Sequence, residues 1–241
     1  MIKTLYKIFQ HWSEYGAVYI LSDLHLDDDD CLYMDPNWIS PEEQIWIINN
    51  KITKDDTFIC LGDVGSSGYA SQIRAGHKVL LLGNHDRRKD YVGIFDEIYE
   101  GPLFISSKIL LSHEPVYGLS WCLNIHGHDH SGIEAYAKGC KHLNLAANVC
   151  GYTPVSLGKL INSGILSDIN SIHRETINRA VDREKWKIQL QKEDLKPVGE
   201  ECDESACDSG CSFETMDVSS GIRTDRREQC GQDSLSNGYC R

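Results

Sequence analysis

The sequence predicts an α/β fold, and two observations along the chain of 241 residues lead to that prediction. Short, continuous apolar runs rich in β-branched residues recur, as expected of strands that are covered on both faces. Segments with apolar residues at helical spacing lie between several of these runs, which indicates helices layered against a mainly parallel or mixed sheet. The hydrophobic fraction of 41% is ordinary for a soluble globular protein.

Six segments are predicted to form strands, because each is a short apolar run. They cover residues 17–22, 57–62, 78–83, 108–113, 123–128 and 142–150. Residues 41–52 are predicted to form a helix, since a proline and two glutamates precede apolar residues at helical spacing. Residues 87–98, which follow the third strand, are predicted to form a second helix.

A long C-terminal helix is predicted over residues 165–192, where apolar and small residues fall on one stripe. The stripe consists of Ile169, Ile172, Thr176 and Ala180. From Pro197 onward Ser, Gly, Asp and Glu dominate, which predicts a disordered, acidic, Cys-rich tail. The expected parts are a core domain, a helix packed on or extending from it, and the tail, over residues 1–165, 166–196 and 197–241.

Charge and composition restrict the partners and the compartment. Nucleic acid or a nucleotide stays open as a partner, but the net charge of −12 does not indicate it, because phosphate binding depends on Lys and Arg. No apolar run approaches the roughly 20 residues of a membrane span, and the first residues lack a signal core, so a cytoplasmic protein is expected. The ten cysteines are then not expected to form a disulfide framework, because disulfides are rare in reducing cytosol.

Five of the predicted strands stop at, or just before, side chains that can bind a metal ion. These are Asp23 and His25, then Asp63, then Asn84 and His85, then His113, and finally His128 and His130. In open α/β sheets, sites form outside the carboxyl ends of strands, so these side chains can converge in one crevice. Carboxylate, imidazole and amide donors without thiolate suit manganese, iron, zinc or a similar divalent ion. They are too many for one tetrahedral ion, but suit two ions about 3.5–4 Å apart that share a carboxylate.

The motifs that contain these residues resemble those of the calcineurin-like metallophosphoesterase family, and most of all its small bacterial or phage members. That family has the motifs D-x-H, G-D, G-N-H-D/E, a lone His and G-H-x-H, in this order. The chain supplies Asp23-Leu24-His25, Gly62-Asp63, Gly83-Asn84-His85-Asp86, Ser112-His113 and Gly127-His128-Asp129-His130. The resemblance covers about residues 17 to 165.

The resemblance implies a layered metallophosphoesterase-type β-sheet core flanked by helices, with residues 1–165 as the catalytic domain. It implies a binuclear enzyme that hydrolyses a phosphodiester or phosphomonoester by in-line attack of a metal-bridging hydroxide. One divalent ion would bind Asp23, His25 and His130, the other would bind Asn84, His113 and His128, and Asp63 would bridge them. Mn²⁺, Fe²⁺, Zn²⁺ and Ni²⁺ all stay open as the metal.

The resemblance also implies the catalytic groups. His85 would bind the substrate phosphate and protonate the leaving oxygen, a step that imidazole performs near neutral pH. Asp86 would orient or support His85. Asn84 is expected to help bind the phosphate. Independently of the resemblance, Arg87 and Arg88 follow this turn and could hold a phosphate, although the exposed first turn of a helix explains them equally well. The acidic run over residues 27–30 is interpreted as a solvated loop.

One departure from the larger superfamily narrows the activity. Phosphoprotein phosphatases extend the second motif to G-D-x-x-D-R-G, whereas residues 62–68 lack the second aspartate and the arginine, so protein phosphatase activity is not expected.

Short spacings between the later motifs leave no room for a capping domain, which predicts an open, shallow site.

Two hypotheses compete with an enzyme whose activity lies in the core. A phosphoesterase scaffold could act as a protein-binding module with little turnover, but the retention of all seven ligands and His85 favours the enzyme. The Cys-rich tail could act as a redox or metal sensor that governs the core. The natural substrate and the oligomeric state stay open.

Overall fold

The structure is a computed structural model that describes residues 1–132 and 140–181. A five-stranded sheet has the order β4-β3-β2-β1-β9, and a four-stranded sheet has the order β5-β6-β7-β8. The first contains β1 (Val18–Leu21), β2 (Thr57–Cys60), β3 (His77–Leu81), β4 (Glu97–Tyr99) and β9 (Val155–Ser156). The second contains β5 (Leu103–Ser106), β6 (Ile109–Leu111), β7 (Leu123–His126) and β8 (Lys141–Asn144).

The helical elements are short. They are η1 (Lys7–Ser13), α1 (Cys31–Met34), α2 (Pro41–Lys51), α3 (Ser67–Ala70), α4 (Arg88–Tyr91), α5 (Leu157–Asn162) and α6 (Ile172–Val181). Within the described ranges, none of them is both long and apolar enough to cross a bilayer.

The strand directions place several strand ends at one edge of each sheet. Strands β1 to β4 are parallel and β9 is antiparallel to β1. In the second sheet β6, β7 and β8 are parallel, and β5 is antiparallel to β6. The carboxyl ends of β1, β2 and β3 therefore lie side by side, as do those of β6 and β7. The prediction of a mixed α/β fold is confirmed.

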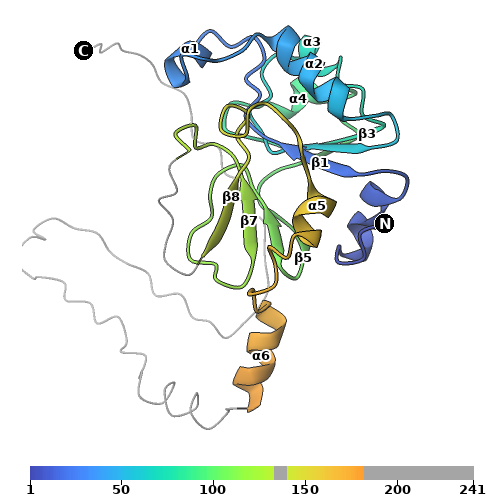
Figure 1. The fold of residues 1–241 in the computed structure, drawn as a ribbon, viewed down its shortest axis with the longest axis vertical. Helices are drawn as coiled ribbons and strands as arrows, with labels where there is room; N and C mark the ends of the chain where they lie inside the picture. Colours follow the sequence, from blue (N-terminus) through green and yellow to red (C-terminus); the bar gives the residue numbers. More distant parts are fainter. Residues whose placement is uncertain (133–139, 182–241) are drawn as a thin grey trace, which may run out of the picture. The chain divides into compact units, whose positions relative to one another are not determined.

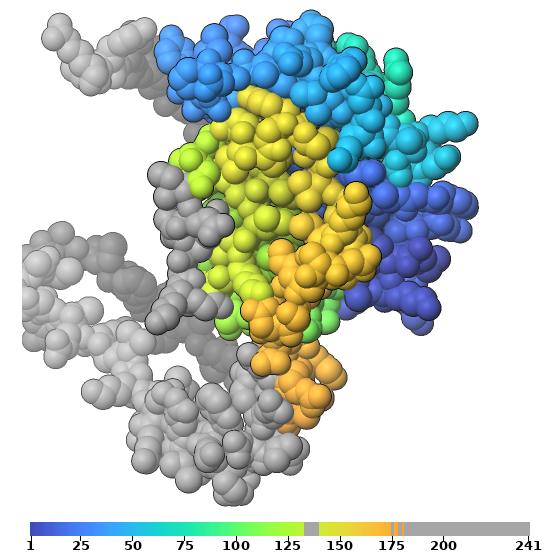
Figure 2. Space-filling model, in the orientation of Figure 1, coloured from blue at the N-terminus to red at the C-terminus, as the bar shows by residue number. Residues whose placement is uncertain are grey.

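The first sheet is buried on both faces, which explains its continuous apolar runs. Alternate residues point toward the second sheet, where Ile20 and Ile59 join a core cluster with Ile125. The residues between them point the other way, and Phe58 packs in a second cluster with Ile48 of α2. Figure 1 shows the same layers, with α2, α3 and α4 on one side of β1 and β3, and β7 and β8 on the other. Figure 2 shows α2, in light blue, directly beside the yellow segment that carries β9 and α5.

The predicted helix over residues 41–52 agrees with α2 to within one residue. Ser40 is its N-cap, and the Ser40 hydroxyl accepts a hydrogen bond of 3.2 Å from the amide of Glu43. Pro41 occupies the first turn, where backbone N–H groups have no partner within the helix, so the lack of an N–H in proline costs no hydrogen bond. The cap and the proline explain why the helix begins at that residue.

The predicted helix over residues 87–98 is wrong for most of its length. Only α4 is helical, and Gly93 then adopts a φ of 85° that an α-helix does not allow. The chain next forms β4, which pairs with β3 from Val79↔Glu97 to Leu81↔Tyr99. Backbone pairing along the edge of the sheet overrides the helical spacing of the apolar residues.

The C-terminal predictions are met only in part. Residues 165–171 precede α6 and are not helical, and Ile169 is buried in the core ahead of the helix. The strand predicted over residues 142–150 ends at Asn144. The elements η1, β5, β9 and α5 were not predicted, because each is too short to show a periodicity. Residues 182–192 of the predicted helix and the Cys-rich tail lie outside the described residues.

The cysteines of the described ranges are free thiols. They are Cys31, Cys60, Cys122, Cys140 and Cys150. Burial raises the pKa of Cys31 and Cys122 to about 11 and that of Cys150 to about 12. These thiols are therefore protonated near neutral pH and pack as small apolar groups.

Candidate metal centre

The loops that follow the strands have unusual backbone conformations. Six described non-glycine residues have a positive φ, and four of them are predicted metal ligands. These four are Asp23 (54°), His25 (39°), Asp63 (50°) and His128 (65°). Such conformations cost about 1–3 kcal/mol each and persist where the surroundings impose them, which is common at ligand-binding sites.

Backbone contacts hold these loops together. The amide of Asp23 donates to the carbonyl of Gly62, and the amide of His25 donates to that of Asp63, both at 2.9 Å. The amide of His128 donates to Asp23 Oδ2 at 2.8 Å, which joins the second sheet to the first. Gly127 makes this approach possible, because a Cβ atom there would lie 1.9 Å from Asp23 Oδ2. The sequence therefore brings the carboxyl ends of the two sheets into direct contact.

The first cluster of donors consists of Asp23, His25 and His130. His130 Nε2 lies 3.7 Å from Asp23 Oδ1. Asp23 and His25 are buried, and neither Asp23 Oδ1 nor His25 Nε2 has a hydrogen-bond partner among the described residues. Buried polar atoms rarely lack a partner unless they bind water or an ion, so this cluster fits a cation.

The second cluster consists of Asp63, His113 and His128, with Asn84 beside them. His113 Nε2 lies 2.8 Å from Asn84 Oδ1, 3.1 Å from His128 Nδ1 and 3.3 Å from Asp63 Oδ2. Two imidazole nitrogens, an amide oxygen and a carboxylate oxygen thus meet at one point. This donor set suits zinc, iron or manganese.

Asp63 lies between the two clusters. Its Oδ2 atom is 3.7 Å from His25 Nε2 in the first cluster and 3.3 Å from His113 Nε2 in the second. Burial by itself would raise the pKa of Asp63, but the hydrogen bond and charge of His113 hold that pKa below its ordinary value. Asp63 is therefore a carboxylate that faces donors on both sides. All seven predicted ligands converge on this region.

The outward nitrogens of three histidines have partners of their own. His25 Nδ1 lies 2.9 Å from Asp28 Oδ2, and His130 Nδ1 lies 3.1 Å from Asn148 Oδ1. His113 Nδ1 lies 2.9 Å from the carbonyl of Leu61. Such contacts at Nδ1 orient metal-binding histidines and direct Nε2 toward the other donors of the cluster.

Two of these supporting residues were not assigned from the sequence. Asp28 was placed in a solvated acidic loop, and the role of Asn148, at the end of the sixth predicted strand, was left open. A carboxylate three residues after a metal-binding histidine is a signal that could have identified Asp28. Nothing in the sequence brings Asn148 to His130, because the contact depends on how the loop after β8 folds.

Asp86 contacts the backbone of the loops. Its Oδ2 atom accepts hydrogen bonds from the amides of Asp63 (2.8 Å) and Gly83 (2.9 Å), and its Oδ1 atom accepts one from Val64 (3.0 Å). These three bonds use both carboxylate oxygens. They tie the loop after β3 to the loop after β2, so the observed contacts of Asp86 are with the backbone around Asp63. The support of the His85 ring that the sequence assigned to Asp86 stays a prediction.

His85 and Arg87 lie on the open side of the centre. The His85 ring is exposed, and its centroid is 5.6 Å from that of His25. The His85 amide donates to Asp63 Oδ1 at 3.0 Å, which fixes the backbone of the catalytic candidate to the shared carboxylate. Arg87 is exposed, and its Nε atom donates to Asp90 at 2.8 Å. Its contact with substrate stays a prediction.

Two pockets adjoin the donor clusters. One, of about 310 Å³, is lined by His25 together with Asp28, Trp38 and Gln44. The other, of about 280 Å³, is lined by Asn84, His113, Pro115 and Val116, among others. One pocket therefore borders the first cluster and the other borders the second.

Comparisons with known proteins place the chain among relatives. A family model described as calcineurin-like phosphoesterase matches residues 16–203. The Gene 66 protein of Mycobacterium phage D29 is 28% identical over a region that covers 48% of this chain and 79% of the phage protein. The crystal structure of AQ665, a protein of unknown function from Aquifex aeolicus, has a TM-score of 0.52 and 23% identity. That match covers 61% of this chain and 98% of AQ665, and it shows a shared fold alone.

We expect Asp86→Asn to destabilise the fold by about 2–4 kcal/mol. The NH₂ group of the asparagine would face a backbone N–H that loses its hydrogen-bond acceptor. The same change should weaken metal binding by about 10- to 100-fold, since Asp63 would lose its backbone support. Urea unfolding and metal titration measure the two effects.

The matched control is Asp90→Asn, which removes only an exposed contact to Arg87 and should change stability by less than about 0.5 kcal/mol. Equal stability of the two variants would contradict the role given to Asp86.

Proposed function

Because the chain belongs to the calcineurin-like phosphoesterase family, we propose that it hydrolyses a phosphoric ester with the help of two divalent metal ions. The observation that carries the proposal is the position of Asp63. Its Oδ2 atom lies within 4 Å of a histidine nitrogen in each of two donor clusters. A carboxylate shared in this way is the feature that distinguishes a binuclear site from two separate ones.

The residues divide between the two ions as follows. The first would be held by Asp23, His25 and His130, the second by Asn84, His113 and His128, and both by Asp63. When bound, the ions would supply Lewis acidity, which activates a water for attack on phosphorus and neutralises charge on the phosphate oxygens. The donor set does not choose between Mn²⁺, Fe²⁺, Zn²⁺ and Ni²⁺.

His85 is the proposed proton donor. Its ring lies beside His25 and faces solvent. A phosphate held by the ions would therefore lie near the ring, which could give a proton to the leaving oxygen. Positioned acids of this kind contribute about 10²–10⁴ to the rate. Asn84 and Arg87 are proposed to bind phosphate oxygens. Asp86 is proposed as a positioning residue that acts through the backbone of Asp63.

A phosphodiester is the substrate class that the two flanking pockets favour. A diester carries two organic groups on phosphorus, and each donor cluster borders a pocket that could take one of them. Asp28 and the ring of Trp38 line the first pocket, which suits a neutral or cationic group better than a second phosphate. With a net charge of −12, the chain suits small diesters better than long nucleic acids.

Asp63→Asn should abolish turnover and weaken the binding of both ions, because an amide cannot supply a charged oxygen to each side. Metal content and hydrolysis of a chromogenic phosphodiester measure this. Asp168→Asn, a change at an exposed aspartate outside both groups of donors, is the matched control and should behave as the wild type. If Asp63→Asn lost only one of two ions, the bridge would be disproved.

His85→Ala should keep both ions and lose hydrolysis by roughly 10²–10⁴, because only the proton donor is removed. Steady-state kinetics on the metal-loaded protein give the rate, and metal analysis confirms the loading. The control is His173→Ala, which removes an exposed histidine on α6. Wild-type rates in His85→Ala would exclude the ring from the reaction.

A bis-aryl phosphate should be hydrolysed faster than the matching mono-aryl phosphate, because only the diester fills both pockets. We expect this order with each of Mn²⁺, Fe²⁺, Ni²⁺ and Zn²⁺. Val116→Trp, which narrows the second pocket, should reduce diester turnover more than monoester turnover. A preference for the monoester with every metal would contradict the proposed substrate class.

A further inference from the structure

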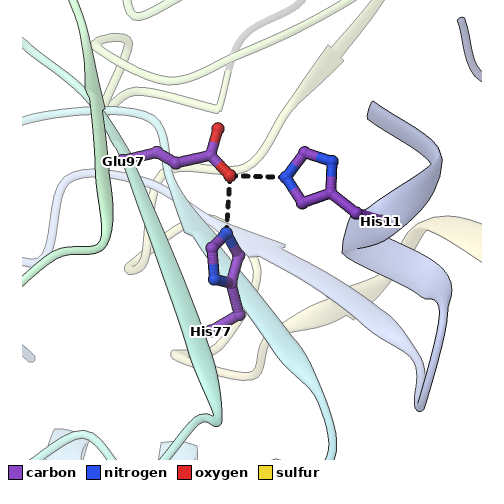
Figure 3. A group of neighbouring side chains, drawn as sticks. All are labelled: His11, His77 and Glu97. Atoms are coloured by element: carbon purple, nitrogen blue, oxygen red, sulfur yellow. Dashed lines mark hydrogen bonds and ion pairs between the residues drawn. The ribbon is translucent and has the colours of Figure 1, made fainter. Parts of the chain in front are cut away.

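A further group of side chains of the types that bind metal ions lies at the opposite, amino end of the first sheet. His77 is the first residue of β3, Glu97 is the first residue of β4, and His11 belongs to η1. Figure 3 shows the rings of His11 and His77 converging on the Glu97 carboxylate from two different elements. The candidate metal centre lies beyond the carboxyl ends of the same parallel strands, so the two groups are separate.

The geometry of this group is compact. The Nε2 atoms of His11 and His77 donate to the same oxygen, Glu97 Oε1, at 2.7 and 2.6 Å. Trp12 Nε1 donates to that oxygen at 2.9 Å, and the Tyr99 hydroxyl donates to Oε2. One ligand atom from each of His11, His77 and Glu97 lies within 4.8 Å of the other two.

We propose that His11, His77 and Glu97 form a zinc-binding site, separate from the candidate metal centre. Two imidazole nitrogens and a carboxylate oxygen are a ligand set that zinc prefers. Tetrahedral zinc with bonds of about 2.0–2.1 Å needs its ligand atoms about 3.3 Å apart. The two nitrogens therefore have to move away from Glu97 Oε1 by less than about 1 Å.

The surroundings already support such ligands. Asp96 Oδ2 lies 3.7 Å from His77 Nδ1, where a carboxylate can orient a zinc-bound imidazole. The Tyr99 hydroxyl donates to Oε2, while Oε1 faces both histidine nitrogens and also accepts from Trp12 Nε1. Burial alone would raise the pKa of Glu97, but hydrogen bonds from His11, Tyr99, Trp12 and His77 lower it to about 2. The carboxylate is therefore ionised near neutral pH.

An ion can reach the site from solvent. The side chains of His11 and His77 are 45% and 31% exposed. Both also line a surface pocket of about 320 Å³ that contains Glu14, Asp55 and Asp56 as well as Lys54. The excess of negative charge attracts a cation, and the open side leaves the fourth coordination position to water. Zinc bound there would link η1 to the edge of the sheet.

Zinc content of the full chain tests the proposal. After equilibrium dialysis against Zn²⁺, His11→Ala and His77→Ala should each hold one ion fewer per chain than the wild type. The matched control His173→Ala should hold the wild-type number, because this exposed histidine lies on α6. Circular dichroism shows whether each variant is folded, and His11→Ala keeps the test valid if His77→Ala is not.

Two results would overturn the proposal. The first is a wild-type zinc count in both His11→Ala and His77→Ala, which would leave the three residues as a hydrogen-bonded group only. The second is a lost ion accompanied by lost phosphodiester hydrolysis, which would assign that ion to the candidate metal centre. Loss of one ion with unchanged hydrolysis supports a separate site.

Discussion

The position of the Asp63 carboxylate is the constraint on which the site depends. Asp63 follows β2, the strand that lies between β1 and β3, so its side chain reaches ligands from both neighbouring loops. Its backbone and side chain are held by Asp86, by the amide of His85 and by the loop after β1. If two cations are to share one carboxylate, that carboxylate has to be fixed before they bind, and these contacts fix it.

The strain in the site follows from the same requirement. Asp23 and Asp63 leave their strands in left-handed conformations that turn the side chains back toward the centre. Glycines allow the loops to approach closely enough for this. A Cβ atom on Gly83 would lie 2.2 Å from Asp63 Oδ1, so an alanine there would displace the carboxylate. The stability of the two-sided apolar core, with Ile59 and Phe58 on its two faces, offsets the cost of these conformations.

The sequence predicted the parts of the molecule that depend on local pattern. The family resemblance and the α/β class are confirmed, and α2 was predicted because its cap and proline mark its start. The seven donors were identified because each follows a strand, and the structure brings them together. Their roles as ligands stay predictions. The helix predicted over residues 87–98 was wrong because apolar spacing cannot show that β4 pairs with an exposed edge. The contacts of Asp28 with His25 and of Asn148 with His130 were not predicted for a related reason, since they are set by how the loops fold.

Anomalous diffraction from crystals soaked in Mn²⁺ would test the central claim most directly, because it locates each ion without relying on activity. The account predicts two manganese peaks about 3.5–4 Å apart, both in contact with the carboxylate of Asp63. One peak in this region, or two peaks of which only one contacts Asp63, would contradict it.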